Sequence, residues 1–132
     1  MTEPPKPARF ADLVGYRLTQ WRADHAELVL ALGPQHGNRT GRLHGGVLAT
    51  LIDAACGYDG TFAVEGRPRN ALTLALTTQF LAPAHAGQLL TAVGRRTGGG
   101  QRIFFAAADV HDEAGRLIAR GDGTFRYIRT EA

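Results

Sequence analysis

The chain of 132 residues has little cysteine and no long apolar run. A single cysteine, Cys56, cannot form an intrachain disulfide, which fits a reducing compartment. No apolar stretch approaches the roughly 20 residues that span a bilayer. The first seven residues contain three prolines and one acid, and they lack the apolar segment of a secretory signal. We therefore expect a cytoplasmic protein with no membrane partner.

Clustered positive charge is also missing. The chain carries 15 basic and 12 acidic residues, which gives a net charge of +3 and a pI near 9.6. No run of five basic residues occurs, and few aromatic residues alternate with the scattered arginines as a nucleic-acid stacking surface requires. We therefore expect no nucleic-acid partner. The mild positive excess suits an anionic small molecule.

Motifs for metals and phosphate loops are absent as well. The five histidines show no H-x-x-x-H spacing, and one cysteine cannot form a C-x-x-C pair. The run Gly98–Gly100 is followed neither by Gly-Lys-Ser/Thr nor by an expected helix, so we interpret it as a hairpin turn. Cys56 has no base placed for it, and we interpret it as a packing residue. We expect no metal and no cofactor.

The apolar periodicity predicts an α+β fold. We expect residues 1–8 to be a flexible tail and residues 9–132 to be a single domain. The expected elements are a helical turn at residues 9–14, strands at 16–21 and 26–32, a helix from Gly45 to about Ala63, and strands at 71–81, 87–97, 101–111 and 117–128. The last four strands would form one antiparallel meander. The sheet would wrap around the helix, and dimerisation could cover its edges.

The long helix has two unlike faces when its residues are placed about 100° apart. The apolar face should pack on the sheet and comprises Leu48, Leu51, Ile52, Ala55 and Phe62. The opposite face has small residues and one acid: Gly46, Ala49, Asp53, Gly57 and Gly60. Asp53 is the only charged residue between Gly45 and Tyr58, whereas a solvated face would carry several. Asp53 is therefore a candidate catalytic acid, and an ordinary polar helix position is the alternative. Asp59 falls near the apolar face, where the sequence gives no reason for an acid.

The dipeptide Gly45-Gly46 follows His44 at the start of this helix. Glycines leave the first backbone N–H groups of a helix uncovered, and these donors can bind an anion or a developing oxyanion. The glycines could instead serve only a sharp turn into the helix. His44 could likewise be a capping or packing residue.

Together these residues form the pattern Asn38-x-x-Gly41-x-x-His44-Gly45-Gly46-x-x-x-x-x-x-Asp53. The pattern closely resembles the signature of hotdog-fold acyl-CoA thioesterases of the phenylacetate-degradation (PaaI) type. The segment from residue 73 to residue 84 resembles the third strand of that family and its Phe-Leu-x-Pro ending. The resemblance implies a hotdog fold, in which an antiparallel sheet of about six strands wraps around one long central helix.

The resemblance also implies hydrolysis of an aryl- or medium-chain acyl-CoA to a free acid and CoA. Asp53 would act as general base or nucleophile, and the backbone N–H of Gly45 would polarise the thioester carbonyl. Asn38 would help to hold that carbonyl, and His44 would lie beside the leaving sulfur. Thr73 would orient the attacking water. One carboxylate and helix-end amides can serve because a thiolate is a good leaving group.

The family builds its site between two subunits, so the resemblance implies a homodimer at minimum, and we expect a homotetramer. The expected substrate-binding residues are Gly46, Arg95, Arg96 and Arg102. Arg67 and Arg69 also lie at expected loop ends, where the arginines as a group could bind the phosphates of CoA. Each arginine alone could equally be a solubilising surface residue.

Two other functions stay open. A hotdog protein of this kind could bind acyl-CoA without turnover, as a sensor. The acyl-carrier-protein dehydratases share the fold and carry an acid about fourteen residues after the histidine, where this chain has Tyr58. An enoyl-thioester hydratase or dehydratase is therefore the weaker alternative.

Overall fold

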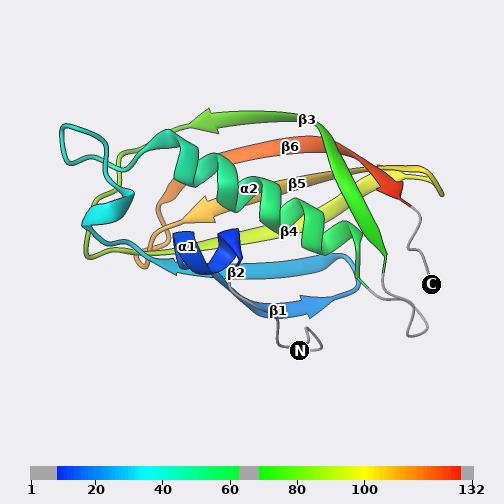
Figure 1. The fold of residues 1–132 in the computed structure, drawn as a ribbon, viewed down its shortest axis with the longest axis horizontal. Coiled ribbons are helices and arrows are strands. Elements are labelled where there is room, and N and C mark those ends of the chain that lie inside the picture. The colour runs from blue at the N-terminus through cyan, green and yellow to red at the C-terminus, as the bar shows by residue number, and fades with distance from the viewer. Residues whose placement is uncertain (1–8, 63–68, 129–132) are drawn as a thin grey trace.

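A computed structural model describes residues 9–62 and 69–128 of the chain (Figure 1). The expected tail, residues 1–8, lies outside the described residues. The elements follow in the order α1 (Phe10–Val14), β1 (Arg17–Arg22), β2 (His25–Ala31), a 3-10 turn (Pro34–His36), α2 (Gly45–Gly60), β3 (Asn70–Phe80), β4 (Leu89–Gly99), β5 (Ile103–His111) and β6 (Leu117–Ile128). Every expected strand is present, with its ends within two residues of the expected ones.

Within these residues, six strands form one antiparallel sheet in the order β1-β2-β4-β5-β6-β3. The α+β class and the hotdog arrangement are therefore confirmed, because the sheet curves around α2 (Figure 1). The expected meander of the last four strands is wrong. Only β4, β5 and β6 follow one another, whereas β3 occupies the far edge and pairs with β6.

The connection between β3 and β4 explains this difference. It is long enough, at residues 81–88, to cross the end of the sheet. At its start the backbone N–H of Leu81 donates to the carbonyl of Ile118 on β6, at 2.8 Å. At its end the N–H of Leu32, after β2, donates to the carbonyl of Gln88, also at 2.8 Å. The turn residues that separate the strands in the sequence do not distinguish such a crossing from a tight hairpin.

Helix α2 packs its apolar face on the sheet as expected. Leu48, Leu51, Ile52 and Ala55 are buried, and each buried leucine contributes roughly 1.5–3 kcal/mol through the loss of apolar surface to water. The helix backbone comes very close to β4, since a Cβ added at Gly94 would lie 2.3 Å from the carbonyl oxygen of Ala55. Gly94 therefore sets how deeply the helix sits in the sheet.

The C-terminal end of α2 differs from the sequence expectation. The helix ends at Gly60, so Phe62 lies beyond it and packs edge-on against Trp21 with ring centres 5.7 Å apart. Gly60 was expected on the open face but is buried, because a Cβ there would lie 1.9 Å from the ring of Phe104. Asp59 is also buried, on the side of the helix where its angle places it. In the part of the chain that the structure describes, no helix has the length and hydropathy of a membrane span.

Candidate active site

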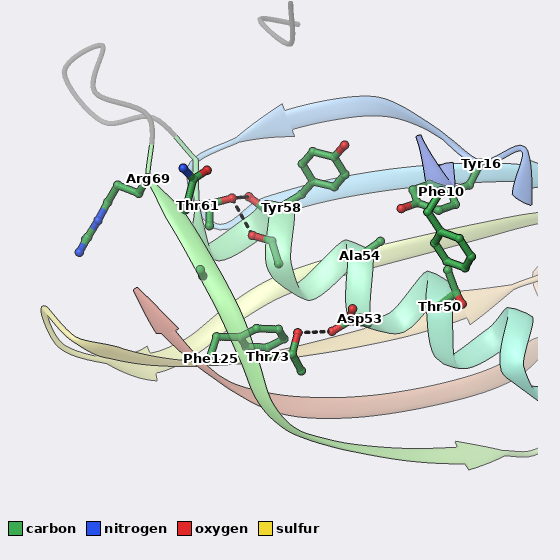
Figure 2. A pocket seen from close by; sticks show the side chains of 13 residues that line it. Phe10, Tyr16, Thr50, Asp53, Ala54, Tyr58, Thr61, Arg69, Thr73 and Phe125 are labelled. Atoms are coloured by element: carbon green, nitrogen blue, oxygen red, sulfur yellow. Dashed lines mark hydrogen bonds between the residues drawn. The ribbon is translucent and has the colours of Figure 1, made fainter. Parts of the chain in front are cut away.

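Asp53 lies at the middle of α2, on the side that faces β3. Its Oδ1 accepts a hydrogen bond of 2.6 Å from the hydroxyl of Thr73, and Figure 2 shows the two side chains directed at each other. Short hydrogen bonds to a carboxylate are among the stronger ones in proteins. No donor among the described residues reaches Oδ2, so this oxygen is available to a water or a substrate.

A β-bulge accompanies Thr73. The pairing of β3 with β6 shifts between Thr73 and Ala75, so Leu74 is an extra residue in the edge strand. Bulges re-aim side chains and are common beside active sites. Here the bulge follows directly after the residue whose hydroxyl holds Asp53. The sequence contains no signal that would have predicted this bulge.

Asp53 and Thr73 line a cavity of about 380 Å³ between α2, β3 and the N-terminal segment. Small residues of α2, Ala54 and Gly57, leave room along the helix. Four aromatic rings also line the cavity, those of Phe10, Tyr16, Tyr58 and Phe125 (Figure 2). Phe10 and Tyr16 did not emerge from the sequence, because they belong to a segment without any recognisable motif.

At the start of α2 the two glycine amides are not equivalent. The N–H of Gly46 donates to Nδ1 of His44 at 2.8 Å, so this imidazole caps the helix. A neutral imidazole that accepts at Nδ1 carries its proton on Nε2. The N–H of Gly45 has no acceptor among the described residues. Gly45 is therefore the amide left for an oxyanion, whereas the N–H of Gly46 is already used.

The side chain of Asn38 is oriented by its own loop. Its Oδ1 accepts from the N–H of Thr40 at 2.8 Å, from the hydroxyl of Thr40 at 2.7 Å and from the N–H of Arg42 at 3.2 Å. Three donors around one oxygen fix which end of the amide is the carbonyl. The remaining group is the NH₂ of Asn38, a donor. Asn38 and Gly45 line a second cavity of about 380 Å³, beside Phe80.

The structure places the expected catalytic residues in two groups. Asp53 and Thr73 line the first cavity, and Asn38 and Gly45 line the second. Gly45 and Asp53 are eight residues apart on one helix (53 − 45 = 8), which is about 12 Å along its axis. A thioester carbonyl at Asp53 is therefore too far from the Gly45 amide of the same chain.

The arginines expected to bind CoA do not lie together in the structure. Arg95 and Arg96 are neighbours on β4, and successive strand residues point to opposite faces of a sheet. Arg95 lies on the outer face, 3.8 Å from Asp109. Arg96 lies on the inner side and donates to the hydroxyl of Tyr127 at 3.0 Å. The structure brings neither guanidinium into the cavity of Asp53.

Among the described arginines, Arg69 is the one that lines this cavity, whereas Arg102 does not line it. The guanidinium of Arg69 lies 3.4 Å above the ring of Tyr127 and donates a hydrogen bond of 2.9 Å to the carbonyl of Gln101. Arg102 is exposed in the turn after β4, and its carbonyl accepts from the N–H of Tyr127 at 2.8 Å. Arg67 lies outside the described residues.

Two buried ionisable groups lie on the sheet side of α2. Burial raises the pKa of the Cys56 thiol to about 12, with the charge of Asp53 as a second cause, so this thiol stays protonated. Asp59 is 3% exposed, and neither carboxylate oxygen has a donor among the described residues. Burial raises the pKa of Asp59 to about 7, and the charge of Asp24 adds to the shift. The described residues contain no group of three metal-ligating side chains.

Known proteins are similar to this chain in sequence and in fold. The thioesterase superfamily profile matches residues 40–119, which include α2 and most of the sheet. The PA0474 protein of Pseudomonas aeruginosa, which carries the provisional name of an esterase, is 38% identical over 75% of this chain and 74% of its own length. Acyl-coenzyme A thioesterase 13 of Mus musculus is 31% identical over 68% of this chain and 64% of its own.

The fold is also similar to that of a solved structure of this kind of protein. The PaaI protein of E. coli, from the phenylacetic acid degradation operon, superposes with a TM-score of 0.82 at 24% identity, over 90% of this chain and 83% of that one. The chain therefore belongs to the thioesterase superfamily and is a thioester hydrolase with a PaaI-like hotdog fold.

Proposed function

We propose that this chain hydrolyses acyl-CoA thioesters at a site shared between two copies, with Asp53 as general base or nucleophile. The observation that carries the proposal is the environment of Asp53. It stands in a cavity, is held by Thr73, and keeps Oδ2 open to a water. The relative named as an acyl-coenzyme A thioesterase supports CoA as the leaving group.

As a general base, Asp53 takes a proton from water while the water oxygen adds to the thioester carbonyl carbon. The oxyanion formed there accepts hydrogen bonds from the N–H of Gly45 and from the NH₂ of Asn38. The C–S bond then breaks, and the CoA thiolate takes the proton from Asp53. As a nucleophile, Asp53 would instead form an acyl anhydride that water opens. Both routes give one free acid and one CoA thiol, and neither needs a cofactor.

Two copies are required because one chain holds its acid and its donors in separate cavities. In a two-fold dimer, the contact of residue i with residue j is repeated as j with i. Antiparallel α2 helices would thus bring each Asp53 to the partner subunit's Gly45 and complete two sites. His44 would then lie near the leaving sulfur, with Nε2–H as the group it can offer.

The edge strand β3 supports such a pairing. It lies at the end of the sheet, and Leu72 and Leu74 on it are 54% and 55% exposed. An exposed apolar edge strand is a surface on which another chain can pair. We propose a homodimer as the minimum assembly and a homotetramer as the larger one.

For the phosphates of CoA we propose Arg69, which lines the cavity near the end of α2, and Arg102, which follows the Gln101 that Arg69 contacts. Both adjoin Tyr127, on whose ring Arg69 is stacked. Arg96 would support this end indirectly, through its hydrogen bond to Tyr127. The four aromatic rings of the cavity support an aryl- or medium-chain acyl group. Rates on phenylacetyl-, benzoyl- and straight-chain acyl-CoAs would rank these groups.

A complementation experiment tests the shared site. Asp53→Asn and Asn38→Ala each remove one half of the site, and each variant alone should be nearly inactive. When equal amounts of the two variants are unfolded together and refolded, about half of the dimers contain one copy of each. Each mixed dimer has one intact site out of two, so about 25% of the wild-type activity should return. A site within one chain would give no recovery. Release of thiol by the wild type also excludes the sensor, which would bind acyl-CoA without turnover.

A further inference from the structure

The short helix α1 forms one wall of the Asp53 cavity. Phe10, its first residue, lines the cavity beside Thr50 of α2 (Figure 2). Phe10 as a residue is 58% exposed. An apolar ring that lines a cavity and is left this open is suited to contact with an apolar group that the chain itself does not supply.

The other three aromatic rings of the cavity contact the core, and Tyr16, at the N-terminal end, is half-buried. Phe125 is buried and stacks on Phe104, with ring centres 4.9 Å apart. Tyr58 packs edge-on against Trp21 at 5.4 Å. Phe10 stands instead on a helix of five residues at the rim of the fold. Of the four lining rings, Phe10 is the one that does not pack against the core, so its removal would enlarge the cavity without disturbing the core.

On the side of Phe10 the cavity is lined by Tyr16, Thr50 and Ala54, and by no charged side chain among the described residues (Figure 2). The hydroxyl of Thr50 donates to the carbonyl of Gly46 at 2.8 Å, so it needs no partner from a substrate. Ala54, one turn further along α2, adds only a methyl group. The guanidinium of Arg69 lies at the opposite end of the cavity (Figure 2). An acyl chain that starts at Asp53 would therefore extend toward Phe10.

Helix α1 is held in this place by His36. This histidine is buried, and its Nδ1 accepts from the N–H of Gly33 at 2.9 Å. Its proton is therefore on Nε2, which donates to the carbonyl of Val14 at 2.5 Å. Val14 is the last residue of α1, and Gly15 ends the helix with a φ of +100°. One side-chain hydrogen bond thus ties α1 to the loop before α2.

We propose that Phe10 sets the size of the acyl group accepted at Asp53, and that His36 is the positioning residue that holds α1 and its ring over the cavity. The preferred substrates are then acyl groups short enough to end at this ring, and longer chains collide with it. This proposal rests on the proposed function, because it describes the acyl end of the same site.

The test compares Phe10→Ala with Leu13→Ala. Both residues are exposed apolar side chains of α1, Leu13 at 78%, but only Phe10 lines the cavity. The readout is the ratio of kcat/KM for dodecanoyl-CoA to that for butyryl-CoA. Phe10→Ala should raise this ratio about tenfold or more, which is the scale of pocket discrimination by a few methylenes. Leu13→Ala should leave it at the wild-type value. An unchanged ratio in Phe10→Ala, or an equal rise in both variants, overturns the proposal.

His36 is tested by a matched pair of amides. Asn can replace the acceptor at Nδ1 but does not reach Val14, whereas Gln places an NH₂ near the position of Nε2. His36→Asn should raise the same ratio, and His36→Gln should restore it toward the wild-type value. A residue with only a structural role would lower both rates together and leave the ratio unchanged, and that result would remove His36 from the proposal.

The double variant Phe10→Ala/His36→Asn adds an independent measurement. If His36 acts through the ring of Phe10, the double variant has the ratio of Phe10→Ala alone, whereas additive effects contradict this route. Failure of the proposed function has a different signature. In that case the wild type releases no thiol from any acyl-CoA, so the ratio of the two kcat/KM values cannot be measured.

Discussion

The hydroxyl of Thr73 on β3 donates a 2.6 Å hydrogen bond to Oδ1 of Asp53 on α2, and so joins the edge strand to the middle of the central helix. The same contact leaves Oδ2 as the oxygen without a protein donor among the described residues. One carboxylate oxygen is thus used for orientation and the other is kept for chemistry. Substitutions of Asp53 and of Thr73 should therefore have different effects.

Asp53→Asn should retain the fold and lower kcat by a factor on the order of 10²–10⁴, as expected for the loss of a general base. The amide has the shape of the carboxylate and can still accept from Thr73, so the geometry is kept while the basicity is lost. Thiol release from acyl-CoA measures the rate, and the thermal midpoint verifies the fold. Near-normal hydrolysis by this variant would remove Asp53 from the proposed mechanism.

Thr73→Val should lower kcat by about 10- to 100-fold, the scale of one hydrogen bond to a charged group at about 1.5–3 kcal/mol. Valine keeps the branched shape that suits a strand but loses the hydroxyl. Thr73→Ser is the matched control, since it retains the donor and should recover most of the rate. If valine and serine behave alike, the hydroxyl does not orient Asp53 during catalysis.

The sequence predicts the central helix and its acid because both depend on local patterns. A period of 3.6 residues defines the face of Leu48 and Leu51, and the lone charge on the other face identifies Asp53. The place of β3 was not predictable in this way, since it depends on residues 81–88 crossing the end of the sheet. Strand order is set by contacts between segments far apart in the chain, which periodicity does not contain.

The two arginines of β4 show a different kind of failure. Arg95 and Arg96 were grouped by their charge, although adjacent strand residues must point to opposite faces. The strand prediction itself could have separated them. The role of Phe10, in contrast, could not be predicted from the sequence. It lines the cavity only because of where the five-residue helix α1 packs in the folded chain.

Gly94→Ala should destabilise the fold by at least about 1–3 kcal/mol, the usual cost of overpacking a core. A Cβ at this position would lie 2.3 Å from the carbonyl oxygen of Ala55, and a helix backbone cannot move aside as a flexible side chain can. Gly100→Ala, in the turn after β4, is the control because nothing lies within 4 Å of its added Cβ. Denaturant unfolding of both variants measures the difference, and equal stabilities would mean that α2 does not rest on Gly94.

Asp59→Asn should stabilise the protein at pH 8 and have little effect at pH 4. The usual pKa of an aspartate is near 3.9, whereas burial raises the pKa of Asp59 to about 7 in the folded state. Between these two values the folded state binds the proton more tightly than the unfolded state does. The contribution of Asp59 to stability is therefore complete below about pH 4, falls as the pH rises to 7, and stays low above it.

Asparagine removes this titration because its amide is neutral throughout the range. At pH 8 the thermal midpoint of Asp59→Asn should exceed that of the wild type by about 5–10 °C, and the difference should shrink steadily toward pH 4. Asp109→Asn, at the exposed ion pair with Arg95, is the control and should shift the midpoint little at either pH. A difference for Asp59→Asn that stays constant with pH would mean that its carboxyl group does not titrate in this window. Water molecules beside the helix would then have to donate hydrogen bonds to the carboxylate oxygens of Asp59.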